Sequence, residues 1–178
     1  MLPRRSWLLL VAVVAVALST TLAALTAFAG ASHKLFIIQR SKNADEVHYD
    51  ARVGGDGALD EKGPVDGYWM NKGADGSFSR AELSTFQKLA YGYDTEPTGN
   101  GSYLLKLKAF KDRPMWIVKA NNSGKWRVQT TIAGKQAFMT RLYVATEEGG
   151  IMPKVLYVDV FGEDAASGGA LTEHLVKR

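Results

Sequence analysis

Two strand-like runs separated by a two-residue turn signal dominate the C-terminal half of the chain. Residues 125–132 alternate polar and apolar side chains, residues 136–146 form a mostly apolar run around Arg141, and Ala133-Gly134 lies between the two runs. This alternation indicates strands with one buried face, and so short a connection joins adjacent antiparallel strands. We therefore expect a hairpin in which Val128 lies opposite Met139, and an antiparallel sheet as the framework of the fold.

Similar runs continue through most of the chain after residue 34, separated by segments rich in Gly, Asn and Pro. The expected strands are residues 35–40, 47–53, 65–70, 103–110, 115–120, 125–132, 136–146 and 154–161. The fold class is therefore mainly β (α+β): a curled or barrel-like antiparallel sheet of about eight strands with one packed helix.

The expected helix follows the run of residues 65–70. Residues 79–82 (SRAE) match the capping-box pattern, and Leu83, Phe86 and Leu89 follow at helical spacing up to Gly92. We expect this apolar stripe to pack on the sheet. A second, short helix is expected at residues 171–176.

The N-terminus carries Arg4 and Arg5 and then an apolar segment, residues 7–29, with no charged residue before Lys34. The pattern predicts that residues 1–29 are a signal peptide cleaved after Ala29. The alternative is an uncleaved membrane anchor, because a helix over residues 7–29 is roughly 35 Å long and the hydrocarbon core is ~30 Å thick. Residues 30–178 are expected to form a single β-rich domain, exported to the periplasm or secreted, or anchored by residues 7–29.

Charge and cysteine content exclude several classes of function. The net charge of +4 includes Arg4 and Arg5, so the exported part is too weakly basic to indicate nucleic acid as a partner. The absence of cysteine excludes disulfides, thiolate metal sites and a cysteine nucleophile. We expect no cofactor, and contact with a membrane only through the N-terminal segment.

The last strands contain two unusual charges, Arg141 and Asp159, each inside an apolar run. If the last hairpin turns about Gly150, these residues face each other, and Trp126 flanks Arg141 from the other side. This predicts a structural ion pair within a row of Trp126, Arg141 and Asp159. The functional alternative is that Arg141 provides the positive charge at the base of a site for an anionic ligand.

A polar turn between the first two strands combines two cations with small hydrogen-bonding residues. Such a turn can hold a carboxylate or phosphate, although Ser, Asn and Asp are also ordinary turn formers. Aromatic residues on neighbouring strands and the helix complete the hypothetical site. The candidate ligand-binding residues are Arg40, Ser41, Lys42, Asn43, Tyr49, Trp69 and Tyr91.

Metal and catalytic patterns are less complete. Glu46, His48 and Asp50 lie on one face of the second strand, which we expect to be solvated, and a strand spreads them over roughly 13 Å. Residues 71–82 resemble a calcium loop with candidate ligands Asp75, Ser77 and Glu82, but the first and third loop positions are Asn and Gly. We therefore expect no metal site.

Nucleophilic catalysis finds little support in the sequence. The patterns G-x-S-x-G, H-E-x-x-H and S-x-x-K are absent. The remaining grouping is Ser41, His48 and Asp50 across the first hairpin, but His48 and Asp50 point the same way two residues apart. The chain is therefore expected not to be an enzyme.

Several stretches together resemble a known family. They are "KLFIIQRSKNADEVHYDA", "GPVDGYWMNK", "SRAELSTFQKLAYGY" and "KAFKDRPMWI". The chain resembles, from Lys34 onward, the exported and mostly bacterial family catalogued as domain of unknown function 4833. The resemblance implies one intact exported domain, and it implies no reaction, cofactor or catalytic residue.

The function we expect is a non-enzymatic binding or interaction module of the cell envelope, with a small anionic ligand or an envelope protein as its partner. One alternative is a hydrolase-like envelope enzyme that uses His48 and Asp50. The other is a purely structural envelope protein. A cleft beside Arg40 and Lys42 favours the first hypothesis, and a filled interior with locally paired polar groups favours the structural one.

Overall fold

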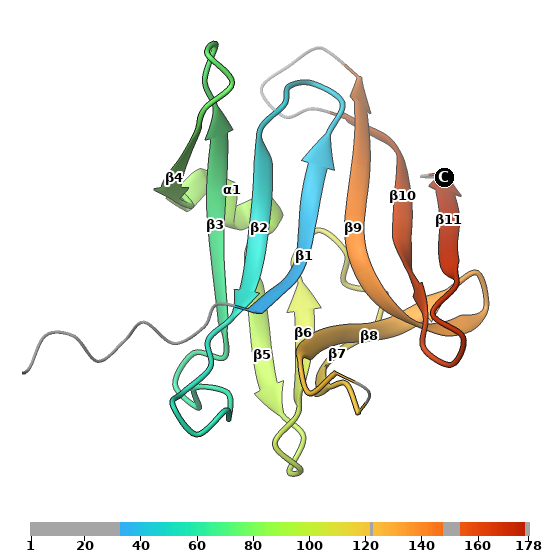
Figure 1. The fold of residues 1–178 in the computed structure, drawn as a ribbon. Helices are drawn as coiled ribbons and strands as arrows, with labels where there is room; N and C mark the ends of the chain where they lie inside the picture. Colours follow the sequence, from blue (N-terminus) through green and yellow to red (C-terminus); the bar gives the residue numbers. More distant parts are fainter. Residues whose placement is uncertain (1–32, 122, 148–153, 177–178) are drawn as a thin grey trace, which may run out of the picture. The chain divides into compact units, whose positions relative to one another are not determined.

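Eleven strands and one helix make up the part of the chain that the computed structural model describes, residues 33–121, 123–147 and 154–176 (Figure 1). The elements are β1 (His33–Arg40), β2 (Glu46–Ala51), β3 (Val65–Lys72), β4 (Phe78–Glu82), α1 (Thr85–Tyr91), β5 (Tyr93–Pro97), β6 (Tyr103–Leu107), β7 (Met115–Lys119), β8 (Trp126–Ile132), β9 (Lys135–Glu147), β10 (Lys154–Asp164) and β11 (Ala170–Val176). Within these residues no helix combines the length and apolarity needed to cross a bilayer. The predicted leader, residues 1–29, lies outside them.

Nine of the strands form one continuous path in the order β4-β3-β2-β1-β9-β8-β7-β6-β5, and β10 and β11 branch from β9. All pairings are antiparallel except β1 with β9, which is parallel. The sheet curls into an open half-barrel, so that β5 and β6 lie behind β1 and β2 in Figure 1, while β7 and β8 lead across to the lower end of β9. The prediction of a mainly β fold with a curled sheet and a helix is confirmed.

Strand β9 connects the two parts of the sheet, because it pairs with strands of both. Its N-terminal part pairs with β8, as in Val128↔Met139, whereas residues 141–144 pair with β1. From Ala137 to Glu147 β9 also pairs with β10, and the register shifts between Phe161 and Gly162, opposite the point where the partner changes. A bulge bends a strand and increases its twist. We call β1–β4 with the C-terminal part of β9 the first layer, and β5–β8 with its N-terminal part the second layer.

The two layers enclose one apolar core. Phe36 and Tyr49 from the first layer, and Ile117, Val128 and Met139 from the second, are all 0% exposed. Removing side chains of this kind from water is the main favourable term in folding. Because the described chain contains no cysteine, packing rather than cross-linking holds the layers together.

The helix and the ends of the sequence-predicted elements need correction. The predicted capping box at residues 79–82 is wrong, because these residues lie in β4 and pair with β3 from Tyr68↔Glu82 to Lys72↔Phe78. The helix instead begins after Ser84, whose side chain accepts from the amide of Gln87. Pairing with β3 supplies strand hydrogen bonds along residues 78–82, and it overrides the local helix signal.

Two further expectations about helices are wrong. Residues 171–176 lie in β11, which pairs with β10 along its full length. In α1, Phe86 and Leu89 are 57% and 63% exposed rather than packed on the sheet. The helix contacts the first layer through Tyr91, whose ring meets that of Trp69 at 5.6 Å.

The predicted row of Trp126, Arg141 and Asp159 is also wrong. Arg141 lies opposite Phe161, and Asp159 lies opposite Tyr143, which is two residues from the expected register. The pairing already differs by one residue at Lys154↔Glu147, and a bulge between Val155 and Tyr157 adds the second. The expected turn about Gly150 lies outside the described residues.

Each of the three side chains in that row has another partner. Arg141 stacks on Phe161, with its guanidinium carbon 3.9 Å from the ring centroid. Asp159 pairs with His174 at 2.6 Å. The indole N–H of Trp126 donates to the carbonyl of Gly57 at 3.2 Å. On β9, Arg141 is paired with Ile37 of β1, so β1 holds the place that the sequence suggested for Trp126.

Candidate functional site

The polar turn between β1 and β2 is anchored to β9. The amide of Ser41 donates to the carbonyl of Val144 at 3.1 Å. The hydroxyl of Ser41 in turn accepts from the amide of Thr146 at 3.0 Å. Because β1 runs parallel to β9, these bonds extend the strand ladder by one residue and hold the start of the turn in place.

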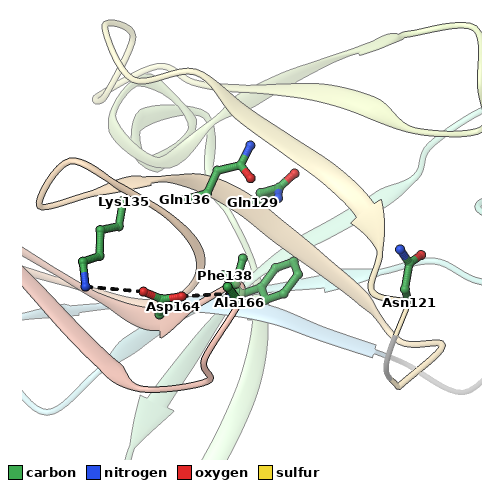
Figure 2. Close-up of a pocket in the computed structure, with 8 residues that line it drawn as sticks. Asn121, Gln129, Lys135, Gln136, Phe138, Asp164 and Ala166 are labelled. Atoms are coloured by element: carbon green, nitrogen blue, oxygen red, sulfur yellow. Dashed lines mark hydrogen bonds and ion pairs between the residues drawn. The ribbon is translucent and has the colours of Figure 1, made fainter.

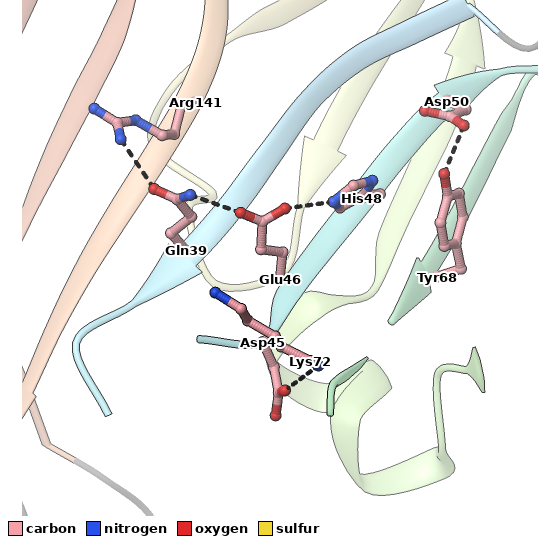
Figure 3. A network of polar contacts seen from close by, with 8 residues as sticks. All are labelled: Gln39, Asp45, Glu46, His48, Asp50, Tyr68, Lys72 and Arg141. Carbon is pink, nitrogen blue, oxygen red and sulfur yellow. Dashed lines mark hydrogen bonds and ion pairs between the residues drawn. The ribbon is translucent and has the colours of Figure 1, made fainter. Parts of the chain in front are cut away.

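Arg40, the last residue of β1, lies over the indole ring of Trp69, with its guanidinium carbon 4.7 Å from the centroid. Its Nη2 donates to the side-chain oxygen of Asn43 at 2.9 Å, and Asn43 donates to Asp45 at 2.7 Å. Asp45 accepts from the amide of Lys72 at 2.9 Å (Figure 3). The guanidinium is therefore stacked on a buried ring and oriented by a neutral amide.

The charge of Arg40 is neutralised less directly than that of most other described arginines. Arg52 and Arg80 pair with Asp66, Arg113 with Glu173 and Arg127 with Glu163. Within the described residues Arg40 forms no ion pair with a carboxylate, and its buried Nε–H has no hydrogen-bond partner there. Donors of a guanidinium that are not satisfied internally favour an anionic partner.

The predicted site residues divide into surface and core. Lys42 and Asn43 are exposed, and Arg40 and Tyr91 are half-buried. Tyr49 is 0% exposed, stacks on Phe36 at 4.4 Å and donates its hydroxyl to the carbonyl of Tyr91 at 2.7 Å. Burial, together with the neighbouring hydroxyls of Tyr91 and Tyr93, raises the pKa of Tyr49. The prediction that Tyr49 contacts a ligand is therefore wrong, because its ring belongs to the core.

A second polar cluster lies on the opposite face of the first layer and spans three strands (Figure 3). Arg141 of β9 donates to the side-chain oxygen of Gln39 at 2.9 Å, and Gln39 donates to Glu46 at 2.7 Å. The other oxygen of Glu46 lies 2.7 Å from Nε2 of His48. We call these four residues the outer-face network.

The expectation that β2 has a solvated face is wrong. His48 and Asp50 are only 8% and 6% exposed, because side chains of the neighbouring strands lie beside them. The ring of Tyr68 lies 5.4 Å from that of His48, and its hydroxyl donates to Asp50 at 2.8 Å. Burial first, and then the bond to Asp50, raises the pKa of Tyr68 to about 12.

Within the described residues the catalytic grouping of Ser41, His48 and Asp50 is not assembled. Hydrogen bonds join Ser41 to β9, His48 to Glu46 and Asp50 to Tyr68. A serine nucleophile needs its base within hydrogen-bond reach. The His48 imidazole is therefore oriented by a carboxylate, as a base would be, but Ser41 is not its partner.

The calcium pattern is split between the two ends of β4. Asp75 accepts from the amide and the hydroxyl of Ser77 at 2.9 and 2.7 Å in the β3–β4 turn. These bonds lower the pKa of Asp75. Glu82 lies at the far end of β4, opposite Tyr68. In the described part of the chain no group of three or more His, Asp or Glu residues is placed to hold a metal ion.

The contacts that join the outer-face network were not predicted from the sequence. Gln39 and Glu46 join the first hairpin to β9, but nothing in their spacing predicts Arg141 as the partner, because the β1–β9 pairing is parallel and distant in sequence. The available signal was Gln39, a polar residue inside the apolar run of residues 35–40, and a polar residue is equally typical of a strand at the edge of a sheet.

The pH dependence of stability tests the outer-face network. Burial raises the pKa of Glu46, but its hydrogen bonds with Gln39 and His48 outweigh this and hold the pKa below its ordinary value of 4.5. A lowered folded-state pKa stabilises the protein above the unfolded-state value, and this contribution is lost as the pH falls through the folded-state pKa. We expect Glu46→Gln to cost about 1 kcal/mol at pH 7 and less as the pH falls below about 4.5.

Urea unfolding of the wild type and the variant at several pH values measures this difference. Glu61→Gln, an exposed carboxylate in the loop before β3, is the matched control and should differ little from the wild type at any pH. An equal cost of Glu46→Gln at pH 7 and pH 3 would contradict the assignment.

Comparisons with known proteins give one match. A family model described as Domain of unknown function (DUF4833) matches residues 36–174. No curated protein matches the chain, and no solved structure matches it. The matched range contains the polar turn, the outer-face network and most of β11.

Proposed function

The chain belongs to the family of the domain of unknown function DUF4833, and on that premise we propose that it is a non-enzymatic binding module of the cell envelope that takes a small anionic ligand at the end of β1. Arg4 and Arg5 and the apolar residues 7–29 support an exported protein. The ligand would carry a carboxylate or phosphate group, whose geometry suits a guanidinium.

The observation that carries the proposal is the state of Arg40. Its side chain is held against Trp69 and by Asn43, so little rotamer entropy remains to be lost when an anion binds. Within the described residues it has no carboxylate partner, unlike Arg52, Arg80, Arg113 and Arg127. A pre-oriented cation whose charge is not neutralised attracts an anion more strongly than a paired one.

Lys42 supplies a second positive charge two residues away. It is exposed, and neighbouring bonds from Ser41 to β9 hold the backbone of the turn. A lysine acts on an anion as a flexible point charge, whereas arginine fixes its orientation. We therefore assign orientation of the ligand to Arg40 and attraction to Lys42.

Thermal unfolding of the full-length protein with inorganic phosphate or citrate tests the proposal. At a free ligand concentration of about ten times Kd, binding adds about 1.4 kcal/mol to stability and raises Tm by about 3–6 °C. We expect Lys42→Ala to reduce this shift by at least half, because a cation near the bound anion is lost. Without the ligand, Lys42→Ala should unfold like the wild type, since the side chain is exposed.

Lys62→Ala is the matched control. It removes the same charge from an exposed position in the loop between β2 and β3, at the other end of β2 from the polar turn. It should retain the full shift, and any general effect of salts on stability should be the same in all three proteins. Equal shifts in the wild type, Lys42→Ala and Lys62→Ala would contradict the proposal.

A further inference from the structure

An open depression of about 620 Å³ lies on the outer face of the second layer (Figure 2). Its floor is formed by β8 and β9, and the turn that follows β10 stands at one side. The lining residues are Asn121, Gln129, Lys135, Gln136, Phe138, Asp164, Ala165 and Ala166. We call it the β8–β9 groove, and its size lies in the range of small-molecule sites.

The turn beside the groove is held rigidly by hydrogen bonds. Asp164 accepts from the amides of Ala166 and Ser167 at 2.9 and 3.0 Å. The amide of Ala165 donates to the carbonyl of Gln136 at 3.0 Å, which ties the turn to the floor. The bonds from Ser167 and Ala166 lower the pKa of Asp164. The wall of the groove therefore exists before any ligand binds, and a preformed wall limits the entropy lost on binding.

The charges at the groove neutralise one another. Lys135 lies 3.6 Å from Asp164. Beside the floor, Arg127 pairs with Glu163 at 2.8 Å and lies over the ring of Phe138 at 4.6 Å. A free anion or cation would meet both signs here, so the groove does not favour a charged ligand.

Three side-chain amides line the groove without a hydrogen-bond partner among the described residues. The side chains of Asn121, Gln129 and Gln136 form no hydrogen bond with any described residue, although Gln129 is half-buried. Gln129 lies opposite Phe138 in the β8–β9 ladder, and Gln136 lies two residues from Phe138 on the same face. Figure 2 shows both glutamine side chains above the ring of Phe138.

We propose that the β8–β9 groove binds a neutral oligosaccharide. Each amide group both donates and accepts hydrogen bonds, as the hydroxyl and acetamido groups of a sugar do. Ala165, which is half-buried, and Ala166, which is exposed, supply apolar surface for the C–H faces of the rings, and the largely buried ring of Phe138 underlies the floor. This site is separate from the anion site at Arg40, and it goes beyond the proposed function.

The test is a ¹H–¹⁵N NMR titration of the full-length protein with chitotetraose and, separately, with cellotetraose. We expect at least one of them to cause saturable shifts in the side-chain amides of Gln129 and Gln136 and in the backbone of residues 135–138 and 164–166. Saturation below about 10 mM would correspond to a weak but specific site. No saturable shift with either sugar, or shifts centred on Arg40, would overturn the inference.

Two variants and a control complete the test. Gln129→Ala and Gln136→Ala should each weaken binding by about fivefold or more, because hydrogen-bonding partners of the sugar are lost. Asn71→Ala removes an amide from β3 that also has no hydrogen bond within the described residues, and it should bind like the wild type. Unchanged affinity in both glutamine variants would overturn the assignment to this groove, provided that their spectra retain the native dispersion.

Discussion

Replacing Tyr49 by alanine should lower the free energy of unfolding by about 3–5 kcal/mol. The side chain is 0% exposed, stacks on Phe36 at 4.4 Å and meets Tyr93 edge-on at 5.8 Å. Its hydroxyl also donates to the carbonyl of Tyr91 at 2.7 Å. The variant therefore loses apolar contacts between the layers and leaves a cavity. Urea unfolding followed by circular dichroism measures the effect.

Two further variants separate the causes. Tyr49→Phe keeps the ring and leaves the Tyr91 carbonyl without its donor, which should cost about 1–3 kcal/mol. Phe86→Ala removes a ring that is 57% exposed on α1, and it should change stability by less than about 0.5 kcal/mol. If Tyr49→Ala were as mild as Phe86→Ala, the assignment of Tyr49 to the core rather than to a ligand site would be wrong.

Replacing Gly162 by alanine should destabilise the fold by about 3 kcal/mol, the upper end of the usual cost of overpacking. A Cβ atom at this position would lie 2.5 Å from the carbonyl oxygen of Phe138 and 2.6 Å from Cδ1 of Ile132. The backbone of β9 cannot move aside without disturbing the pairing at the register shift. The bend that lets β9 serve both layers thus depends on this close approach.

Thermal unfolding of Gly162→Ala checks this expectation, with a fall in Tm of about 6–12 °C. Gly55→Ala is the matched control. An added Cβ at Gly55 meets no atom within 4 Å, and the residue lies in the exposed loop after β2, so Tm should stay within about 2 °C of the wild type. A Gly162→Ala protein with the Tm of the wild type would show that β9 and β10 accommodate the added Cβ atom, and would contradict the assignment.

The best sequence predictions concern neighbours along the chain. The β8–β9 hairpin and its pair Val128↔Met139 followed from alternation and a two-residue turn, because both features act within a few residues. The prediction for the last hairpin was wrong because the pairing already differs by one residue at Lys154↔Glu147, and a bulge between Val155 and Tyr157 adds a second. The apolar pattern tolerates the error, since a shift of two residues keeps every side chain on its face.

The candidate site shows the same division. Arg40 and Asn43 were identified from their concentration in one turn, and they are in contact at 2.9 Å. Trp69 was included as a neighbour, but its stacking under Arg40 depends on the β2–β3 pairing. The amides of the β8–β9 groove left no signal, because Asn121, Gln129 and Gln136 belong to different elements and are ordinary surface residues when seen separately.

The sequence by itself determined the class of fold, the approximate positions of eight strands and the polar turn after β1, because period-two burial and turn chemistry are local properties of the chain. Only the tertiary structure decided that residues 78–82 and 170–176 are strands, and that β1 runs parallel to β9. It also decided which face of β2 is covered, which places His48 and Asp50 among paired, buried groups. These outcomes depend on which distant strands share an edge, and hydrogen bonding between such strands outweighs the weak preference of any short segment.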